Sequence, residues 1–324
     1  MKPTFVTGAT GFVGWHVARL LIEKGHRVRA LVRPGRTVPE LEVETVEGDL
    51  RDRASLERGM AGCGVAFHVA ADYRLWAPNP AELFETNVGG TVNMLEAARD
   101  CGLDRLVYTS TVGCIGFTGD RAGTEDAPTM REAMAGPYKR SKYEAELRAI
   151  EFCSSGFPVI IVNPTAPVGD HDFKPTPTGK IIVDFLRGRM PAYVDTGLNL
   201  VDVEDVAEGH WLALERGRKG ERYILGGENL TLKAIFDLLA SVSGRPAPSV
   251  EISYAVAYLA GWISTAWAKL TKTEPAVPLD AVRMAAKKMW VSHAKAAEHL
   301  GYRPRPALEG LRRAVDWFRA NGYT

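Results

Sequence analysis

The chain has 324 residues, of which 46% are hydrophobic and 24% are charged, and its formal net charge is +1. This balance is typical of a globular protein with one large domain or two unequal ones. It provides no strong electrostatic field for a nucleic acid, so we expect no nucleic-acid partner. The four cysteines, at positions 63, 101, 114 and 153, lack the spacing of a metal site, so we expect reduced thiols, a cytoplasmic location and no metal.

The first half of the chain alternates short β-branched runs with longer amphipathic runs, and a strand pattern follows Lys2 without a signal peptide. Strands are predicted at Phe5–Thr7, Val28–Val32, Val43–Glu47, Val65–Val69, Leu106–Ser110 and Val159–Asn163. Helices are predicted at about Phe12–Lys24, Ala81–Asp100 and Tyr138–Ser154. Strands joined by crossover helices pair in parallel, so we predict an α/β fold with a doubly wound parallel sheet of the Rossmann type. It spans residues 1–165, and a segment at about 195–230 returns to it.

The second half is less regular. The stretch Asp170–Lys180 is rich in proline, threonine and charge, and it predicts a loop near the sheet edge where such folds bind ligands. Helices are predicted after Thr231 and at about Leu308–Asn321. We therefore expect residues 166–324 to form a smaller, mostly helical region that binds the substrate.

The segment Ile252–Leu270 is the longest apolar stretch, but small and charged residues interrupt it, so we expect no transmembrane helix. It also carries four large aromatic residues: Tyr254, Tyr258, Trp262 and Trp267. One interpretation is a helix packed within the second region. The other is an apolar wall for a hydrophobic substrate, or a surface for peripheral membrane contact.

A glycine-rich turn joins the first strand to the first helix. Gly8, Gly11 and Gly14 have the spacing G-x-x-G-x-x-G, one residue longer in the turn than the usual dinucleotide fingerprint. Gly8 permits a tight turn, Gly11 lets a diphosphate approach the backbone, and Gly14 lets the helix pack on the sheet. A purely structural turn is the less favoured alternative. The predicted cofactor contacts here are Gly8, Thr10, Gly11, Phe12, Val13 and Gly14.

The second predicted strand ends at Arg33, where an acid would bind the ribose hydroxyls of NAD. A guanidinium binds a 2′-phosphate well, which favours NADP as cofactor, with NAD and a solvated arginine as the alternative. Asp49 and Leu50 follow the third strand and are expected beside the adenine. Asp49 could equally be a helix N-cap.

Tyr138 and Lys142 stand four residues apart on a predicted helix, which places both on one face. A free phenol has a pKa of about 10, and we expect the Lys142 ammonium to lower the pKa of Tyr138. The phenol could then exchange a proton with a substrate alcohol or carbonyl, while Lys142 would also bind ribose hydroxyls. The hydroxyls of Tyr108–Thr111 end the fifth strand, and one of them could hold the substrate oxygen.

Six segments together resemble the extended short-chain dehydrogenase/reductases, a family that includes sugar-nucleotide epimerases, dihydroflavonol reductases and 3β-hydroxysteroid dehydrogenases. They are Thr7–Gly14, Gly48–Leu50, His68–Ala71, Thr86–Thr91, Tyr108–Gly116 and Tyr138–Lys142. The resemblance implies a catalytic hydroxyl at Thr111, with Ser110 as second choice. It also implies that Ala70 and Ala71 line the cofactor and that Asn87 supports it or a proton relay. Pro164 and Thr165 would touch the nicotinamide end, and the two long helices would form a homodimer contact.

A narrower resemblance, to the bacterial hopanoid-associated sugar epimerases, rests on Asn163–Gly169, Lys174–Phe185, Arg189–Leu198 and Tyr223–Leu232. One departure is Asp202, where relatives often have histidine, and this puts the role of that position in doubt.

Three functions follow from these patterns. The favoured one is an NAD(P)-dependent oxidoreductase that transfers hydride to or from a secondary alcohol or carbonyl of a small sugar, lipid, sterol-like or hopanoid-related substrate. The second is a sugar epimerase with a tightly held cofactor, whose nucleotide-sugar diphosphate would need cations in the substrate region. Candidates for those cations are Lys180, Arg187, Arg189 and Arg222. The third, a dinucleotide-sensing protein without catalysis, is disfavoured because it has no need of Thr111, Tyr138 and Lys142 together.

Overall fold

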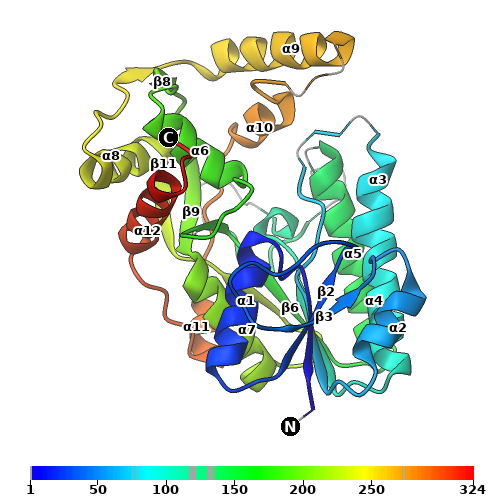
Figure 1. Cartoon of the computed structure of the whole chain (residues 1–324). Helices are drawn as coiled ribbons and strands as arrows, with labels where there is room; N and C mark the ends of the chain where they lie inside the picture. The colour runs from blue at the N-terminus through cyan, green and yellow to red at the C-terminus, as the bar shows by residue number, and fades with distance from the viewer. Residues whose placement is uncertain are drawn as a thin grey trace.

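A seven-stranded parallel sheet forms the centre of the molecule (Figure 1). The computed structural model describes residues 2–74, 76–77, 79–116, 122–129, 134, 136–271, 273 and 275–324, apart from the side chain of Lys269. The strands of the sheet are β1 (Thr4–Thr7), β2 (Val28–Val32), β3 (Glu44–Glu47), β4 (Val65–His68), β5 (Arg105–Thr109), β6 (Val159–Pro164) and β10 (Arg222–Leu225). Their order is β10-β6-β5-β4-β1-β2-β3, and every neighbouring pair is parallel. The predicted doubly wound α/β fold is confirmed.

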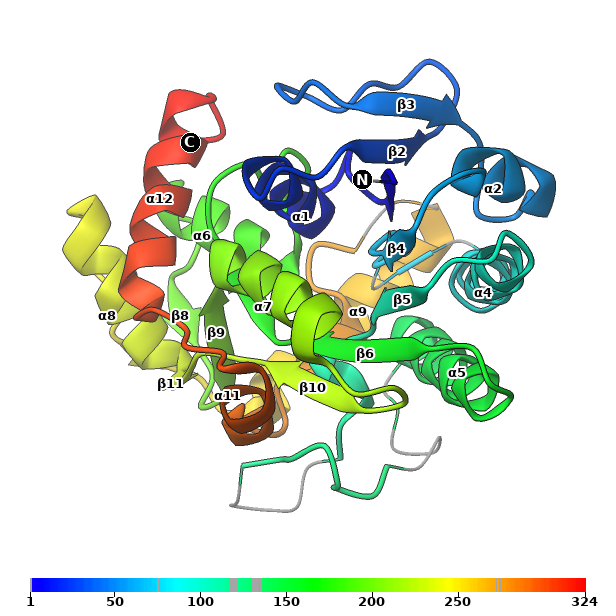
Figure 2. The same ribbon diagram turned by 90° about the horizontal axis from the view of Figure 1, so that it is seen from below.

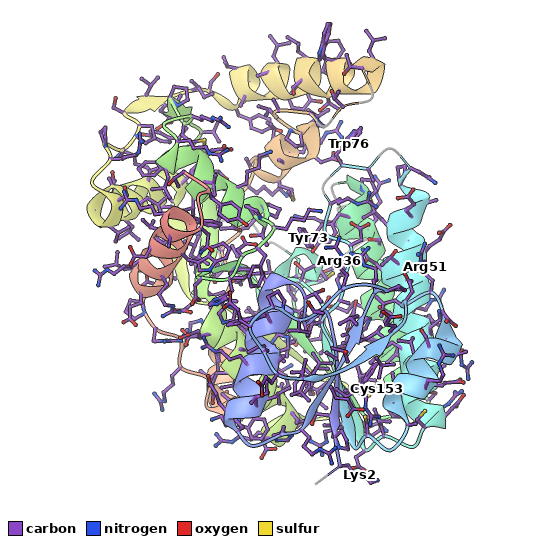
Figure 3. All side chains as sticks on the ribbon, in the orientation of Figure 1. Lys2, Arg36, Arg51, Tyr73, Trp76 and Cys153 are labelled. Atoms are coloured by element: carbon purple, nitrogen blue, oxygen red, sulfur yellow. The ribbon has the colours of Figure 1, made fainter. Side chains whose placement is uncertain are left out.

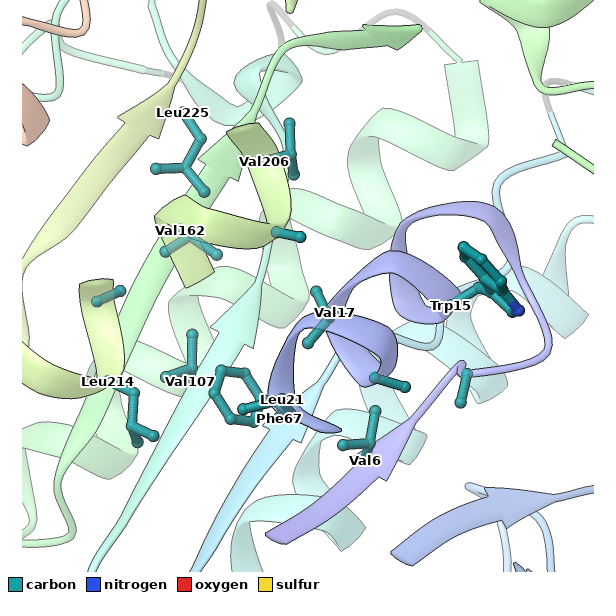
Figure 4. Packing of buried hydrophobic residues seen from close by; sticks show 14 of the residues in the cluster. Val6, Trp15, Val17, Leu21, Phe67, Val107, Val162, Val206, Leu214 and Leu225 are labelled. Atoms are coloured by element: carbon teal, nitrogen blue, oxygen red, sulfur yellow. The ribbon is translucent and has the colours of Figure 1, made fainter. Parts of the chain in front are cut away.

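Helices cover both faces of this sheet, which explains why its central strands are buried along their whole length (Figure 2). One face is covered by α1 (Phe12–Glu23), α7 (Val203–Arg216) and α11 (Ala294–Leu300). The other face is covered by α2 (Arg53–Met60), α4 (Gly90–Asp100) and α5 (Gly136–Ser154). Figure 4 shows how Val17 and Leu21 of α1 meet Phe67 of β4 and Val107 of β5 in the first of these two cores.

The predicted helix Ala81–Asp100 contains an irregular turn. It begins as α3 (Ala81–Phe84), widens into a π-helical turn at Glu85–Gly89, and continues as α4. Such a turn inserts one extra residue into the helix and is common at functional sites. Here the turn contains Asn87, which is buried.

The rest of the chain forms smaller sheets and helices beside the carboxyl edge of the main sheet. One sheet has the order β11-β9-β7, and the other pairs β12 with β8. Their bounds are Ala166–Val168 (β7), Ala192–Tyr193 (β8), Gly197–Asp202 (β9), Glu228–Thr231 (β11) and Val250–Glu251 (β12). The helices are Pro177–Leu186 (α6), Leu232–Ser243 (α8), Tyr254–Thr271 (α9), Leu279–Met284 (α10) and Ala307–Ala320 (α12). A third core, which includes Phe236 and Phe318, joins α6, α8 and α12.

The loop predicted at Asp170–Lys180 is wrong in its last four residues, because α6 already begins at Pro177. The Thr176 hydroxyl caps this helix by accepting a hydrogen bond from the Gly179 N–H at 3.1 Å. A proline in the first turn costs no backbone hydrogen bond, so its presence there is compatible with a helix start.

Candidate active site

Three glycines shape the turn between β1 and α1. Gly8 has φ +82°, and a Cβ there would lie 2.7 Å from the Ala70 nitrogen. A Cβ on Gly14 would lie 2.1 Å from the Gly8 carbonyl oxygen, so only glycine lets α1 approach the strand this closely. A Cβ on Gly11 would meet only the Gly8 carbonyl, at 3.4 Å, which leaves its outer side open.

The amino terminus of α1 is left without a side-chain cap. Gly11 occupies the N-cap position with no side-chain hydrogen bond, and the first turn carries no acidic residue. Free N–H groups and a positive helix dipole at an open glycine turn suit an anion such as the diphosphate of a dinucleotide. Thr10 and Gly11 are exposed at this turn, whereas the Phe12 ring is buried edge-on against His16 and Val13 packs on the first core.

The carboxyl end of β2 carries two exposed arginines. The Arg36 N–H donates to the Arg33 carbonyl at 3.0 Å, and this turn keeps both residues at the same end of the strand. Within the described residues, no acidic side chain forms an ion pair with either of them. Arg33 is a predicted cofactor contact, whereas Arg36 is not, although the second arginine after Pro34 and Gly35 is a visible signal in the sequence. Figure 3 labels Arg36 and Arg51 near the carboxyl edge of the sheet.

Asp49 is not a helix N-cap, because α2 begins at Arg53 and Asp52 occupies that position. Its carboxylate accepts hydrogen bonds from the Arg51 N–H at 2.9 Å and from the Arg51 guanidinium at 2.8 and 3.0 Å. The hydrogen bond from Arg51 lowers the pKa of Asp49, and the charge of Arg33 contributes in the same direction. Leu50 is buried against α4, where a Cβ on Gly90 would lie 2.8 Å from the Leu50 Cβ.

The structure separates the hydroxyl groups at the end of β5. The Thr109 hydroxyl is hydrogen-bonded to His210 Nε2 at 2.8 Å, on the far side of the sheet, and Ser110 Oγ contacts Cys114 Sγ at 3.5 Å. Thr111 instead lies close enough to the Tyr138 phenol for its hydroxyl to lower the pKa of that phenol. Thr111 is therefore the hydroxyl that faces Tyr138.

Lys142 is almost completely buried against the end of β5. Its Nζ donates to the Tyr108 hydroxyl at 3.0 Å and to the Thr109 carbonyl at 2.8 Å. Burial lowers the pKa of Lys142 to about 8. The predicted lowering of the Tyr138 pKa by Lys142 is wrong here, because the ammonium bonds to β5 while burial of Tyr138 raises the pKa of its phenol well above the ordinary value.

A buried chain of polar groups continues from Lys142 toward the glycine turn. Tyr108 is hydrogen-bonded to Thr91, whose Oγ1 lies 3.1 Å from His68 Nε2. His68 Nδ1 lies 2.9 Å from the Thr7 hydroxyl, which also accepts from the Ala70 N–H at 3.2 Å. Burial lowers the pKa of His68 to about 3, so the ring is neutral. Sequence analysis gave no role to Thr91 or His68, since each gains its partner only through the sheet.

Asn163 and Glu146 hold the backbone of Thr111. Asn163 Nδ2 donates to the Thr111 carbonyl at 3.1 Å and to Glu146 Oε2 at 2.7 Å. The other oxygen of Glu146 accepts from Arg222 at 3.1 Å. Arg222 is therefore bound in this network, so its prediction as a free cation for a substrate diphosphate is wrong. Lys180, Arg187 and Arg189 are exposed.

Asn87 fastens the segment after Ala71 to α5. Its Nδ2 donates to the Asp72 carbonyl and to Ser141 Oγ, both at 2.9 Å, and its Oδ1 accepts from the Asp72 N–H at 2.8 Å. These bonds fit the predicted supporting role better than a relay. Ala70 and Ala71, which directly precede the Asp72 that Asn87 holds, are half-buried.

At the end of β6, Pro164 is buried and Thr165 bonds back to the sheet. The Thr165 N–H and hydroxyl both donate to the Leu225 carbonyl, at 3.2 and 3.5 Å. Asp202, whose role the sequence left in doubt, caps α7 by accepting from the Glu204 N–H at 2.9 Å and also contacts Arg313. Its position is thus structural.

One cluster in the described chain could hold a metal ion. His16, Asp170 and His171 each offer a ligand atom, and these atoms lie within 4.8 Å of one another. They are already engaged with each other, since His16 Nε2 lies 3.0 Å from the Asp170 carbonyl and His171 Nδ1 lies 3.1 Å from Asp170 Oδ2. Arg313 also approaches Asp170 to 3.9 Å, which disfavours a cation. The expectation of no metal stays a prediction.

Known proteins resemble this chain over its whole length. The model of the NAD dependent epimerase/dehydratase family matches residues 4–226. A Synechocystis sp. protein described as "Putative dihydroflavonol 4-reductase" is 43% identical, over 98% of this chain and 95% of that protein. Sterol demethylase protein B of Methylococcus capsulatus is 32% identical, over 98% and 99%. The crystal structure of a protein called gox2253 is 45% identical and superposes with a TM-score of 0.89 over 100% of both chains.

No helix within the described residues is long and apolar enough to cross a membrane.

Proposed function

We propose, because the chain belongs to the NAD dependent epimerase/dehydratase family, that it uses NADP to transfer hydride to or from a carbonyl or secondary alcohol of an apolar, sterol-like or hopanoid-related small molecule. The chain is an extended short-chain dehydrogenase/reductase, so its reaction class is an oxidoreduction or an epimerisation. The observation that carries the proposal is that Thr111 interacts with Tyr138 while the buried Lys142 bonds to the end of β5, at the same sheet edge as the open glycine turn.

The glycine turn fits a dinucleotide, because the absence of side chains at Gly8, Gly11 and Gly14 leaves space beside the backbone for the diphosphate. Gly8 to Gly14 and the free amino terminus of α1 would hold the diphosphate, with Asp49 and Leu50 at the adenine end. Ala70, Ala71, Pro164 and Thr165 would line the nicotinamide end, and Asn87 would support it. A nicotinamide bound there supplies or accepts the hydride.

The chain's own residues handle the proton and the orientation of the substrate. Thr111 would donate a hydrogen bond to the substrate oxygen and hold it against the Tyr138 hydroxyl. Tyr138 would give its proton to the oxygen during reduction or remove one during oxidation. Because burial raises the phenol pKa, Tyr138 stays protonated at neutral pH, which suits reduction of a carbonyl. Lys142, whose Nζ bonds to the end of β5, would bind the ribose hydroxyls of the cofactor.

The adenosine end supports NADP over NAD. Arg33 and Arg36 are exposed without acidic partners in the described chain, and two guanidinium groups are well suited to a 2′-phosphate. Asp49 is paired with Arg51, and Glu47 accepts a hydrogen bond from the Gly35 N–H at 3.1 Å. NAD remains the alternative cofactor.

The names of two relatives and the engagement of Arg222 both support an apolar substrate. Arg222 is bound to Glu146, and the two named relatives are described as acting in flavonol and sterol chemistry. We propose that residues 1–165, with 195–230, hold the cofactor and that 166–324 bind the substrate. We further propose a cytoplasmic homodimer with contacts along Ala81–Asp100 and Tyr138–Ser154.

A sugar epimerase is the second candidate, because the matching family model takes its name from epimerases and dehydratases. The two functions differ in how they treat the cofactor. A reductase releases it in each turnover and consumes external NADPH with a suitable ketone. An epimerase retains it and shows no net consumption.

The test measures nicotinamide released from the purified protein on denaturation and NADPH consumption with apolar ketones. We expect little resident cofactor and ketone-dependent oxidation of NADPH. Tyr138→Phe should lower kcat by at least about 100-fold, since a positioned general acid contributes on this order, while the Kd for NADPH changes little. Stoichiometric resident cofactor without consumption would support the epimerase, and near-normal activity of Tyr138→Phe would remove Tyr138 from the mechanism.

A further inference from the structure

The helix α9 presents its large apolar side chains to the outside of the protein. Of the twelve exposed large hydrophobic residues in the described chain, nine lie between Val250 and Val277. Seven of these are on α9 itself: Tyr254, Val256, Leu259, Trp262, Ile263, Trp267 and Leu270. Such a concentrated apolar patch on the surface of a single chain marks an interaction surface.

The opposite face of α9 explains this orientation. Its inner positions are small: a Cβ on Gly261 would lie 2.9 Å from Val282 of α10, and Ala268 is buried. Ser264 Oγ accepts from the Val277 N–H and Thr265 Oγ1 from the Leu279 N–H, each at 3.0 Å. The contacts of α9 with the rest of the protein therefore use its small and polar residues. The large residues are left outside, the reverse of a helix that packs into a core.

The chemistry of the exposed face fits a lipid surface. Trp262 is 55% exposed and Trp267 is 65% exposed, and tryptophan is enriched where proteins meet the membrane interface. No acidic residue occurs from Tyr254 to Thr271. Exposed cations follow on α10 and just beyond it: Lys287, together with Arg283 and Lys288, which pair with Asp280 and Asp195 at 3.1 Å. Residues 250–290 carry five basic and three acidic residues, which complements an anionic surface.

We propose that the outer face of α9 docks on an anionic lipid bilayer, with its tryptophans at the headgroup level. The helix lies on the bilayer and does not cross it. Figure 1 shows α9 at the end of the molecule opposite the amino terminus, which is the side where the carboxyl ends of the parallel strands lie. Docking there brings the candidate active site close to the membrane. The advantage of this position for an apolar substrate held in the membrane rests on the proposed function, whereas the docking itself does not.

Co-sedimentation with vesicles tests the docking without any measurement of activity. The full-length protein and Tyr138→Phe are mixed with vesicles of phosphatidylcholine alone or with phosphatidylglycerol added at about a third of the lipid. Both proteins should bind the mixed vesicles more tightly. Trp262→Ser and Trp267→Ser should each weaken binding on the order of tenfold, and Lys287→Glu should reduce the preference for anionic lipid.

The matched control compares two exposed isoleucines. Ile263 on α9 is 54% exposed and Ile22 on α1 is 36% exposed. Ile263→Ser should weaken vesicle binding, whereas Ile22→Ser should leave it unchanged, and both should keep the circular dichroism and Tm of the parent protein.

Three outcomes would overturn the proposal: no binding to either vesicle, equal losses for Ile263→Ser and Ile22→Ser, or protein self-association that Trp262→Ser abolishes while vesicle binding stays absent. The last result would identify α9 as a contact between copies of the chain. Vesicle binding by a protein that consumes no NADPH would support the docking and count only against the proposed reaction.

Discussion

Replacing Lys142 by methionine should remove a pH-dependent cost that the folded protein carries. The Lys142 ammonium is buried, and within the described residues its Nζ bonds to the Tyr108 hydroxyl and the Thr109 carbonyl. Burial lowers its pKa from 10.5 to about 8. Folding therefore favours the neutral amine, and the free energy of unfolding rises as the pH increases from about 8 to 10.5.

The size of the effect follows from these two values. At about 1.4 kcal/mol for each pH unit between them, the charged form costs the folded protein about 3 kcal/mol at neutral pH. Methionine has a similar length and no charge. The difference in unfolding free energy, Lys142→Met minus wild type, should be about 3 kcal/mol more favourable at pH 7 than at pH 10.5, by the same conversion. The free energy of the hydrogen bonds that the substitution removes depends little on pH, so it largely cancels when the two pH values are compared.

Urea denaturation followed by tryptophan fluorescence, at several values from pH 7 to pH 10.5, measures the difference. Lys180→Met is the control, because Lys180 is exposed and its replacement should give no such trend. A Lys142→Met difference that stays constant across this range would show that the ammonium keeps its ordinary pKa, and the burial argument would fail. Loss of activity together with a gain in stability at pH 7 would mark Lys142 as a residue kept for function.

Three more substitutions test other parts of the site. Arg33→Ala should weaken the binding of NADPH by about 1.5 to 3 kcal/mol, the usual loss for a charged hydrogen bond, and leave the binding of NADH nearly unchanged. Equal increases in the two Kd values would contradict the NADP proposal. Gly14→Ala would place a Cβ 2.1 Å from the Gly8 carbonyl, so cofactor binding should fall more than tenfold and thermal denaturation should show a loss of about 1 to 3 kcal/mol, whereas Gly89→Ala, which meets nothing within 4 Å, should keep both. Thr111→Val should lower kcat by about 100-fold and Ser110→Ala by far less, because Thr111 interacts with the Tyr138 phenol while Ser110 contacts Cys114. The opposite ranking would move the catalytic hydroxyl to Ser110.

Local patterns in the chain were enough to predict the fold. The strand Val28–Val32 has the bounds that its β-branched run predicts, and the glycine turn begins one residue after β1. These features depend on backbone conformation and on burial of one or both faces, which nearby residues specify. The start of α6 at Pro177 was missed although its signal is local, since Thr176 caps the helix and a proline suits its first turn. The π-helical turn at Asn87 was harder to predict, because the contacts of Asn87 with Asp72 and Ser141 come from other segments.

The sequence by itself determined which residue types stand at the carboxyl edge of the sheet, since the spacing of Gly8, Gly11 and Gly14 and of Tyr138 and Lys142 is local. Only the tertiary structure decided how those groups pair. Thr109 bonds His210, 101 residues away, and Arg222 bonds Glu146, 76 residues away, so neither is free for a ligand. Likewise Lys142 bonds Tyr108, 34 residues away, and burial reverses the predicted direction of the Tyr138 pKa. Partners and dielectric environment arise when distant segments pack together, and spacing along the chain carries no information about either.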